Sequence, residues 1–192
     1  INNENIFTVR SLADADKIKD YIKNNNVKSA VVVGAGFIGI EMAENFAHLG
    51  LDTKVVELSN QILAPIDYEV ACFAQNEMRD KGVELILSDG VKLFKEKEIE
   101  LNSGKTIPYD IAILAIGVKP ETTLAKNSNL EVNRGIIVNE NMQTNDENIY
   151  AGGDSVEIKH FVTNNDVLIP LAGPANRQGR IIADNMCNLK SN

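Results

Sequence analysis

Hydrophobic residues recur with two different periods along the first 120 residues of the chain. Segments 11–24, 37–49 and 67–81 carry apolar residues at helical spacing, and short, almost continuously apolar runs lie between them. Such runs are typical of strands that are buried on both faces of a parallel sheet. The runs lie at 30–33, 53–58, 83–87 and 109–117. The residues expected to face inward from the third helix are Val70, Phe73, Ala74 and Met78. Because strands and helices alternate, the pattern predicts an α/β fold with a parallel sheet.

The pattern changes after residue 90. Residues 91–110, VKLFKEKEIELNSGKTIPYD, contain short alternating runs joined by the tight turns KEK and NSG, and they predict a β-meander. The phrase VKPET at 118–122 interrupts the pattern, and a short strand (GIIV) and a helix entered through Pro174 follow it. We therefore expect three parts. They are a linker or remnant of another domain at 1–10, the α/β domain at 11–122, and a separate segment at 123–192.

A glycine-rich turn joins the strand at 30–33 to the next helix, in the sequence AVVVGAGFIGIEMAENFAHLG. Gly34 permits a tight turn, Gly36 lets a phosphate approach the backbone, and Gly39 lets the helix pack closely on the strand. The free N–H groups at the start of the helix would then face the phosphates. The pattern predicts a Rossmann-like dinucleotide turn. Its expected cofactor-binding residues are Gly34, Gly36, Phe37, Ile38 and Gly39.

An acidic residue follows the next strand and bears on the choice of dinucleotide. Glu57 lies 57 − 39 = 18 positions after Gly39, where a carboxylate can accept hydrogen bonds from a ribose 2′-hydroxyl. A 2′-phosphate 4 Å from Glu57 would cost on the order of 4 kcal/mol at an effective dielectric constant near 20. No Arg, Lys or His lies between Leu58 and Pro65 to neutralise such a phosphate. The sequence therefore predicts NAD(H) in preference to NADP(H).

Composition narrows the class of partner. The formal net charge is −8, and no run of Lys or Arg exceeds two residues, which argues against nucleic acid and anionic membranes. No apolar stretch approaches the roughly 20 residues that span a bilayer. Cys72 and Cys187 lie far apart, and no grouping of residues has the spacing of a metal site. We expect a cytoplasmic protein without a metal, and we assign no role to Cys72, Cys187 or His160.

A second phrase, TNDENIYAGGD at 144–154, identifies the context of the glycine turn. It resembles the TxxxxhYAxGD phrase of the pyridine nucleotide–disulfide oxidoreductases, flavoenzymes in which an NAD domain is inserted into a split FAD domain. The resemblance implies that Asp154 binds the ribityl chain of the flavin. It also implies that 11–122 is a Rossmann-like NAD(H)-binding domain, that 123–192 is the C-terminal segment of the FAD domain, and that 1–10 belongs to the FAD domain.

Three other stretches are similar to the same family. GAGFIGIEMAE resembles its NAD turn and implies that Glu41 lies beside the nicotinamide. AILAIGVKPET resembles the strand whose terminal glycine, here Gly117, brings backbone near the cofactor. PLAGPANRQGRIIADN most resembles the coenzyme A-disulfide reductase and NADH oxidase branch. There a helix directs its N-terminus at the flavin, which implies flavin contacts from Leu171, Ala172 and Gly173.

The resemblance implies an enzyme that passes hydride from NADH to FAD and then to a small-molecule acceptor, namely a disulfide, persulfide, peroxide or dioxygen. The family's redox cysteine and first FAD-binding turn are expected in an N-terminal segment that precedes these residues, so no catalytic residue is assigned here. Homodimerisation is expected through a C-terminal domain that follows them. We interpret the chain as an interior fragment without turnover of its own.

A different class of protein, a non-enzymatic NAD-binding module that senses redox state, would share the glycine turn. Such a module would give no function to the phrase TNDENIYAGGD, and the sequence contains no basic helix suited to binding DNA. A short-chain dehydrogenase is excluded because it needs a Tyr followed by Lys four residues later. The four Tyr residues are followed at that spacing by Asn25, Cys72, Ile113 and Asp154.

Overall fold

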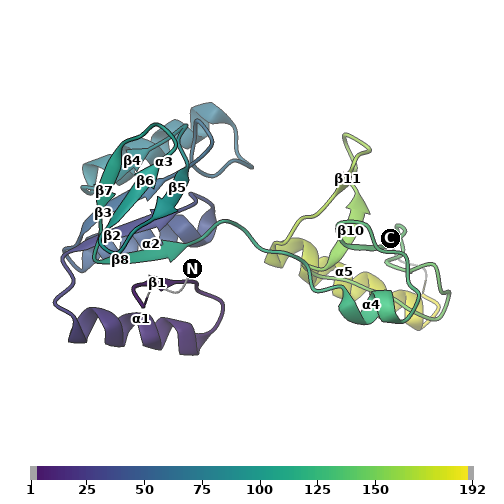
Figure 1. Ribbon diagram of the computed structural model, residues 1–192. Helices are drawn as coiled ribbons and strands as arrows, with labels where there is room; N and C mark the ends of the chain where they lie inside the picture. The colour runs from purple at the N-terminus through teal and green to yellow at the C-terminus, as the bar shows by residue number, and fades with distance from the viewer. Residues whose placement is uncertain (1–3, 190–192) are drawn as a thin grey trace. The chain divides into compact units, whose positions relative to one another are not determined.

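The computed structural model describes residues 4–189 of the chain (Figure 1). Contacts between residues divide the chain into two compact units, Ile1–Gly117 and Val118–Asn192, which we call unit 1 and unit 2. No helix among residues 4–189 is long and apolar enough to cross a membrane.

Unit 1 is built on a five-stranded parallel sheet with the strand order β1-β8-β2-β3-β4. Its strands are β1 (Ile6–Phe7), β2 (Ser29–Val33), β3 (Asp52–Val56), β4 (Glu84–Ile86) and β8 (Ile111–Leu114), and its helices are α1 (Leu12–Asn24), α2 (Phe37–His48) and α3 (Tyr68–Asp80). An antiparallel meander, with the order β5-β6-β7, consists of β5 (Val91–Phe94), β6 (Glu98–Leu101) and β7 (Thr106–Pro108). The α/β class, the parallel sheet and the meander predicted from the sequence are confirmed.

The two faces of the sheet carry two separate cores, because side chains alternate along each strand. Ala30 and Val32 of β2 pack on the side of the helices, together with Phe46 of α2. Val31 and Val33 pack on the opposite side against the meander, which contributes buried apolar residues such as Leu101. This explains why the run at 30–33 is apolar at every position: both faces of β2 are covered.

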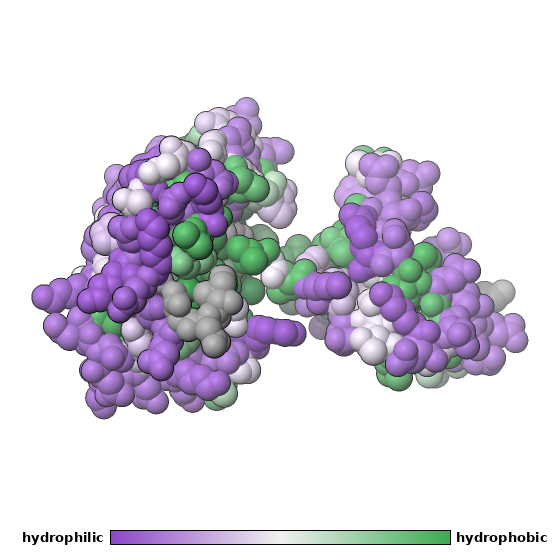
Figure 2. Space-filling view, in the orientation of Figure 1, coloured by the Kyte–Doolittle hydropathy of each residue, from purple (hydrophilic) through white to green (hydrophobic). Residues whose placement is uncertain are grey.

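Unit 2 is smaller and has a small core. Its elements are α4 (Thr123–Asn127), β9 (Ile136–Ile137), β10 (Val156–Lys159), β11 (Asp166–Val167) and α5 (Ala172–Met186), and its three strands have the order β11-β10-β9. The core cluster consists of Val138, Met142, Val156 and Ile181. Large apolar side chains remain exposed on both units (Figure 2), and in unit 2 they include Phe161, which is 100% exposed.

Three local expectations differ from the structure. In segment 1–10, which we expected to be a linker or remnant, Ile6 and Phe7 form β1 and pair in parallel with β8. The last helix begins at Ala172 rather than at Pro174, because proline is tolerated within the first turn, where the N–H groups have no intrahelical acceptor.

The third difference concerns the inward face of α3. Val70 and Phe73, which we expected to be buried, are 54% and 78% exposed. The buried residues are Ala71, Gln75 and Met78, at the i, i+4, i+7 spacing of one helical face. The hydrophobicity pattern favoured a different face of the helix because Gln75 is polar. It is buried because its Oε1 accepts a hydrogen bond from the Ile62 N–H (3.2 Å).

Candidate functional site

The glycine turn is wedged between the end of β8 and the start of α2. Gly34 directly follows β2, has φ +97° and donates its N–H to the Val56 carbonyl (2.8 Å). A Cβ on Gly34 would lie 2.4 Å from the Ala115 carbonyl oxygen, and one on Gly39 would lie 2.0 Å from the Gly34 carbonyl oxygen. Both contacts are shorter than van der Waals distance, so a side chain at either position would require the backbone to move.

Gly36 serves the turn in a different way. It is the N-cap of α2 and has no side chain that could satisfy the first N–H groups of the helix. A Cβ at Gly36 would meet no atom of residues 4–189 within 4 Å, so the described chain leaves the space beside its backbone open. Phe37 and Ile38 follow in the first turn, and both are partly exposed. Unsatisfied N–H groups beside open space fit an anionic group such as a pyrophosphate.

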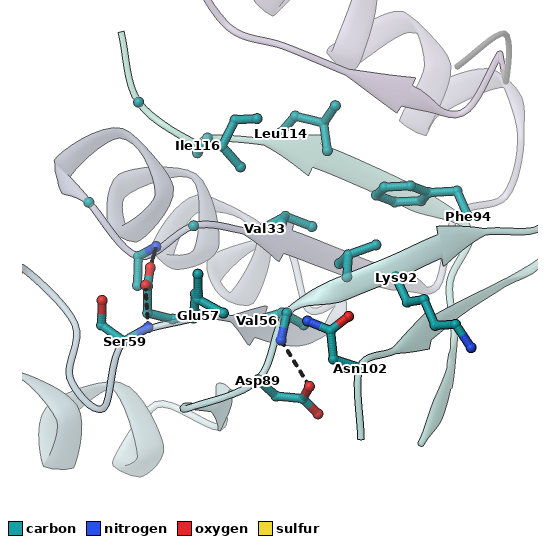
Figure 3. Close-up of a pocket in the computed structure, with 18 of the residues that line it drawn as sticks. Val33, Val56, Glu57, Ser59, Asp89, Lys92, Phe94, Asn102, Leu114 and Ile116 are labelled. Carbon is teal, nitrogen blue, oxygen red and sulfur yellow. Dashed lines mark hydrogen bonds between the residues drawn. The ribbon is translucent and has the colours of Figure 1, made fainter. Parts of the chain in front are cut away.

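Glu57 braces the same turn from the end of β3 (Figure 3). Its Oε2 accepts a hydrogen bond from the Ala35 N–H (2.7 Å), and its Oε1 accepts one from the Ser59 N–H (2.8 Å). Leu63 closes the loop by donating its N–H to the Ala35 carbonyl (2.8 Å). A carboxylate oxygen offers about two acceptor positions, so each oxygen of Glu57 can also accept from a hydroxyl.

A cavity of about 940 Å³ lies between the ends of the central strands and the meander. Its lining residues are Val33–Gly36, Val56–Ser59, Asp89–Phe94, Asn102 and Leu114–Gly117. The position fits the rule for open α/β sheets: ligands bind beyond the carboxyl ends of the strands where the strand order reverses, here between β2 and β8. Its size falls within the range of small-molecule and cofactor sites.

Four of the predicted site residues line this cavity, namely Gly34, Gly36, Glu57 and Gly117. Gly117 has φ +100°, and a Cβ added to it would meet nothing within 4 Å. Phe37, Ile38 and Gly39 lie at the adjoining start of α2, and Glu41 is exposed on the same helix. Sequence reasoning missed the contribution of the meander, including Asn102. Spacing along the chain gives no signal for it, because the packing of the meander over the sheet creates this wall.

The remaining predicted residues belong to unit 2. Asp154 is exposed in the turn after Gly153, which has φ +86°. The buried Gln178 of α5 accepts a hydrogen bond from the Gly153 N–H at its Oε1 (2.7 Å), so the turn is fixed to the helix. Leu171 is the N-cap of α5, with Ala172 and Gly173 in the first turn, and no side chain of the described residues caps this end. Helix α5 therefore contributes to both parts of unit 2 that were predicted to face the flavin: it holds the turn before Asp154, and its N-terminal end is formed by Leu171–Gly173.

Neither cysteine is in a disulfide: Cys72 is partly buried and Cys187 is exposed. Among residues 4–189 no group of three or more His, Cys, Asp or Glu side chains is arranged to hold a metal ion. The described residues of the site offer backbone N–H groups at the start of α2 and the Glu57 carboxylate.

A parallel sheet with a glycine turn, an acidic residue at the end of the next strand and a cavity at the switch point defines a dinucleotide-binding protein. The chain belongs to the pyridine nucleotide-disulphide oxidoreductase family, which matches residues 1–179. The family uses FAD and NAD(P)H.

Two curated relatives cover almost the whole chain. The NADH oxidase of Methanocaldococcus jannaschii is 37% identical over 98% of this chain and 43% of its own length. The coenzyme A disulfide reductase of Staphylococcus epidermidis is 34% identical over 94% of this chain and 42% of its own length. The chain thus spans less than half of the curated relatives that it matches. The family and branch expected from the sequence are confirmed.

Solved structures agree with the fold. The reduced CoADR-RHD of Bacillus anthracis has a TM-score of 0.93 and 44% identity, covering 99% of this chain and 35% of that protein. The water-forming NADH oxidase of Lactobacillus brevis, bound to NADH, has a TM-score of 0.87 and 28% identity, covering 100% of this chain and 43% of that protein. An engineered NADPH oxidase made from it, bound to NADPH, has a TM-score of 0.85 and 28% identity, covering 97% of this chain and 42% of that protein.

Proposed function

We propose that unit 1 binds NADH in the cavity beside the glycine turn, as part of an FAD-dependent oxidoreductase. The observation that carries the proposal is that Gly34, Gly36 and Glu57 line one cavity. The backbone from Gly34 to Gly39 would hold the pyrophosphate, and the Glu57 carboxylate would accept from the ribose hydroxyls. The bound nicotinamide supplies a hydride, while the residues of the chain bind and orient it.

The other predicted residues complete the proposed arrangement. Glu41 and Gly117 would lie on the nicotinamide side of the cavity. Asp154 would accept from the ribityl hydroxyls of FAD, and the start of α5, Leu171–Gly173, would face the flavin ring. There the positive end of the helix would stabilise negative charge by roughly 0.3–2 kcal/mol. On this basis 11–122 is the NAD(H) domain and 123–192 is a segment of the FAD domain.

The whole protein would pass hydride from NADH to FAD, and then electrons to a disulfide, persulfide, peroxide or dioxygen. Its homodimeric assembly and its location in the cytoplasm belong to the same proposal. The present chain alone is expected to show no steady NADH consumption when FAD and dioxygen are supplied. Continuous consumption would contradict the view that the chain supplies binding surfaces only.

The preference for NADH follows from the fixed position of Glu57. The N–H groups of Ala35 and Ser59 hold both carboxylate oxygens, so the charge stays beside the expected ribose. In the engineered NADPH oxidase an Asp is replaced by Ala and the next residue, an Ala, by Arg. That Asp lies 18 positions after a Gly that is also replaced, which is the separation of Gly39 and Glu57. Counting from the glycine, Glu57 and Leu58 stand at the two replaced positions.

The test is the double substitution Glu57→Ala with Leu58→Arg, compared with Leu58→Arg alone. Calorimetric titration of the unaltered chain is expected to give NADH binding at least about 10-fold tighter than NADPH binding, equivalent to about 1.4 kcal/mol. The double variant is expected to reverse this order, because it removes the repelling carboxylate and adds a cation for the 2′-phosphate. Leu58→Arg alone should retain the preference for NADH. Equal affinities of the unaltered chain for the two nucleotides would refute the role given to Glu57.

A further inference from the structure

The end of the cavity beyond Glu57 is built around Gly90, at the start of the meander. A Cβ on Gly90 would lie 2.8 Å from Nδ2 of Asn102 and 3.3 Å from Cδ1 of Leu58. The absence of a side chain at Gly90 therefore lets the Asn102 amide and the Leu58 side chain converge. Because Leu58 directly follows Glu57, this wall adjoins the place proposed for the ribose.

The backbone around Asn102 is held firmly in position. Asn102 donates its N–H to the Gly90 carbonyl (2.8 Å). The Asp89 carboxylate accepts from the Ser103 N–H (3.2 Å) and Oγ (2.6 Å), and also from the Gly90 N–H (2.9 Å). These bonds lower the pKa of Asp89, with the Ser103 hydroxyl as the largest contribution. The turn between β6 and β7 is thus fastened to the loop between β4 and β5.

The side chain of Asn102 takes no part in these hydrogen bonds. Among the hydrogen bonds between described residues, none involves its amide group, although asparagine in a turn commonly bonds to nearby backbone. Figure 3 draws this amide among the side chains that line the cavity, close to the start of β5. A rigid backbone therefore presents one donor group and one acceptor to the cavity.

We infer that Asn102 recognises the adenine of the dinucleotide by hydrogen bonds to the edge of the base. The inference rests on the proposed NADH binding in this cavity. Adenine presents an amino donor beside a ring-nitrogen acceptor, and an Asn amide can pair with both at once. Adenine is attached to the ribose whose hydroxyls Glu57 would bind, so the base extends past Glu57 towards Leu58 and Asn102. Leu58 offers an apolar surface to the face of the base, while the Asn102 amide meets its edge.

The test compares Asn102→Ala with Asn24→Ala, a matched substitution at an exposed position near the end of α1. Both variants and the unaltered chain are titrated calorimetrically with NADH and with ADP-ribose, which retains adenine but lacks nicotinamide. Asn102→Ala is expected to weaken both ligands by the same factor, about 5- to 30-fold. Asn24→Ala should change neither affinity. The amides of Gly90 and Ser103 should stay protected from hydrogen exchange in Asn102→Ala, because their bonds to Asp89 do not involve the substituted side chain.

The outcomes separate the two proposals. Unchanged NADH affinity in Asn102→Ala, with NADH bound normally by the unaltered chain, would overturn the role of Asn102 and leave the proposed function intact. Weaker NADH binding with unchanged ADP-ribose binding would place the effect at the nicotinamide end, and it would also overturn the role of Asn102. Failure of the unaltered chain to bind NADH would overturn the proposed function and the inference together.

Discussion

The two units hold their predicted site residues by different physical means. In unit 1, apolar cores on both faces of the sheet fix the strands whose ends carry the glycine turn and Glu57. In unit 2, whose described core cluster has four buried residues, two buried polar side chains hold the loops: Glu157 binds the turn at 133–135, and Gln178 binds Gly153. Packing therefore positions the strands that carry the first site, and hydrogen bonds to Glu57 add to it, whereas in unit 2 buried polar side chains hold the loops. Substitutions should affect the two units independently and in different ways.

The largest effect is expected from Gly34→Ala in unit 1. The new Cβ would lie 2.4 Å from the Ala115 carbonyl oxygen, and the backbone conformation at φ +97° is unfavourable for alanine. We expect unit 1 to lose about 3 kcal/mol of unfolding free energy and to lose NADH binding. Denaturant unfolding followed by amide hydrogen exchange measures this loss for each unit separately.

Gly36→Ala is the matched control for packing. Its Cβ would meet no atom of the described residues within 4 Å, so the stability of unit 1 should change by less than about 0.5 kcal/mol. The added methyl group would nevertheless occupy the space proposed for the pyrophosphate and should weaken NADH binding. If Gly34→Ala were as stable as Gly36→Ala, the glycine turn would not depend on its packing against β8.

The next largest effect is expected from Glu157→Gln in unit 2. Glu157 is buried and accepts from the Arg134 side chain at 3.0 and 3.1 Å, and from the N–H groups of Arg134 (3.1 Å) and Gly135 (3.4 Å). Removing the charge leaves these donors poorly paired and should cost unit 2 about 3 kcal/mol. Hydrogen exchange in unit 1 should be unchanged. Lys159→Gln, which removes an exposed ion pair with Asp166 (2.7 Å), should cost less than about 1 kcal/mol.

The same carboxylate predicts a dependence on pH. Burial alone would raise the pKa of Glu157, but the hydrogen bonds from Arg134 and Gly135 outweigh it and hold the pKa below its usual value. A lowered folded-state pKa stabilises the fold above the unfolded-state pKa of about 4.3, and this contribution is lost as the pH falls through the folded-state pKa. The stability difference between the unaltered chain and Glu157→Gln in unit 2 should therefore shrink below about pH 4. A difference that stayed constant from pH 7 to pH 3 would contradict this account.

A smaller effect is expected from Gln178→Met, which removes the acceptor for the Gly153 N–H while keeping a side chain of similar length. The loss of one such bond should cost about 1 kcal/mol, so that the Gly153 amide exchanges about 5-fold faster. Gln178→Glu retains an acceptor oxygen and should keep the slow exchange. Identical exchange rates in the Met and Glu variants would show that Gln178 does not hold the turn.

The sequence predicts the features that depend on local patterns, and it does not predict those that depend on how distant elements pack together. The α/β class, the meander and the glycine turn depend on local patterns, such as the apolar run Ala30–Val33 and the spacing of Gly34, Gly36 and Gly39, and these are visible in the chain. The wall formed by Gly90 and Asn102 depends on how the meander packs over the sheet, so no spacing reveals it.

Buried polar side chains are another feature that a hydrophobicity pattern does not predict. Gln75 and Gln178 are almost fully buried because each accepts a backbone N–H from a loop distant in sequence. A hydrophobicity pattern treats both as surface residues. For α3 this shifted the predicted inward face from Ala71 and Gln75 to Val70 and Phe73.

The smallest predicted effect tests which face of α3 is buried. Phe73 is 78% exposed on α3, so Phe73→Ser removes little buried area and should change the stability of unit 1 by less than about 0.5 kcal/mol. Met78 is 9% exposed on the buried face of the same helix, and Met78→Ala should cost about 2–3 kcal/mol. Denaturant unfolding of both variants measures the difference. A loss for Phe73→Ser as large as that for Met78→Ala would mean that the Phe73 side chain is covered in solution, because an exposed ring cannot contribute such a free energy of burial.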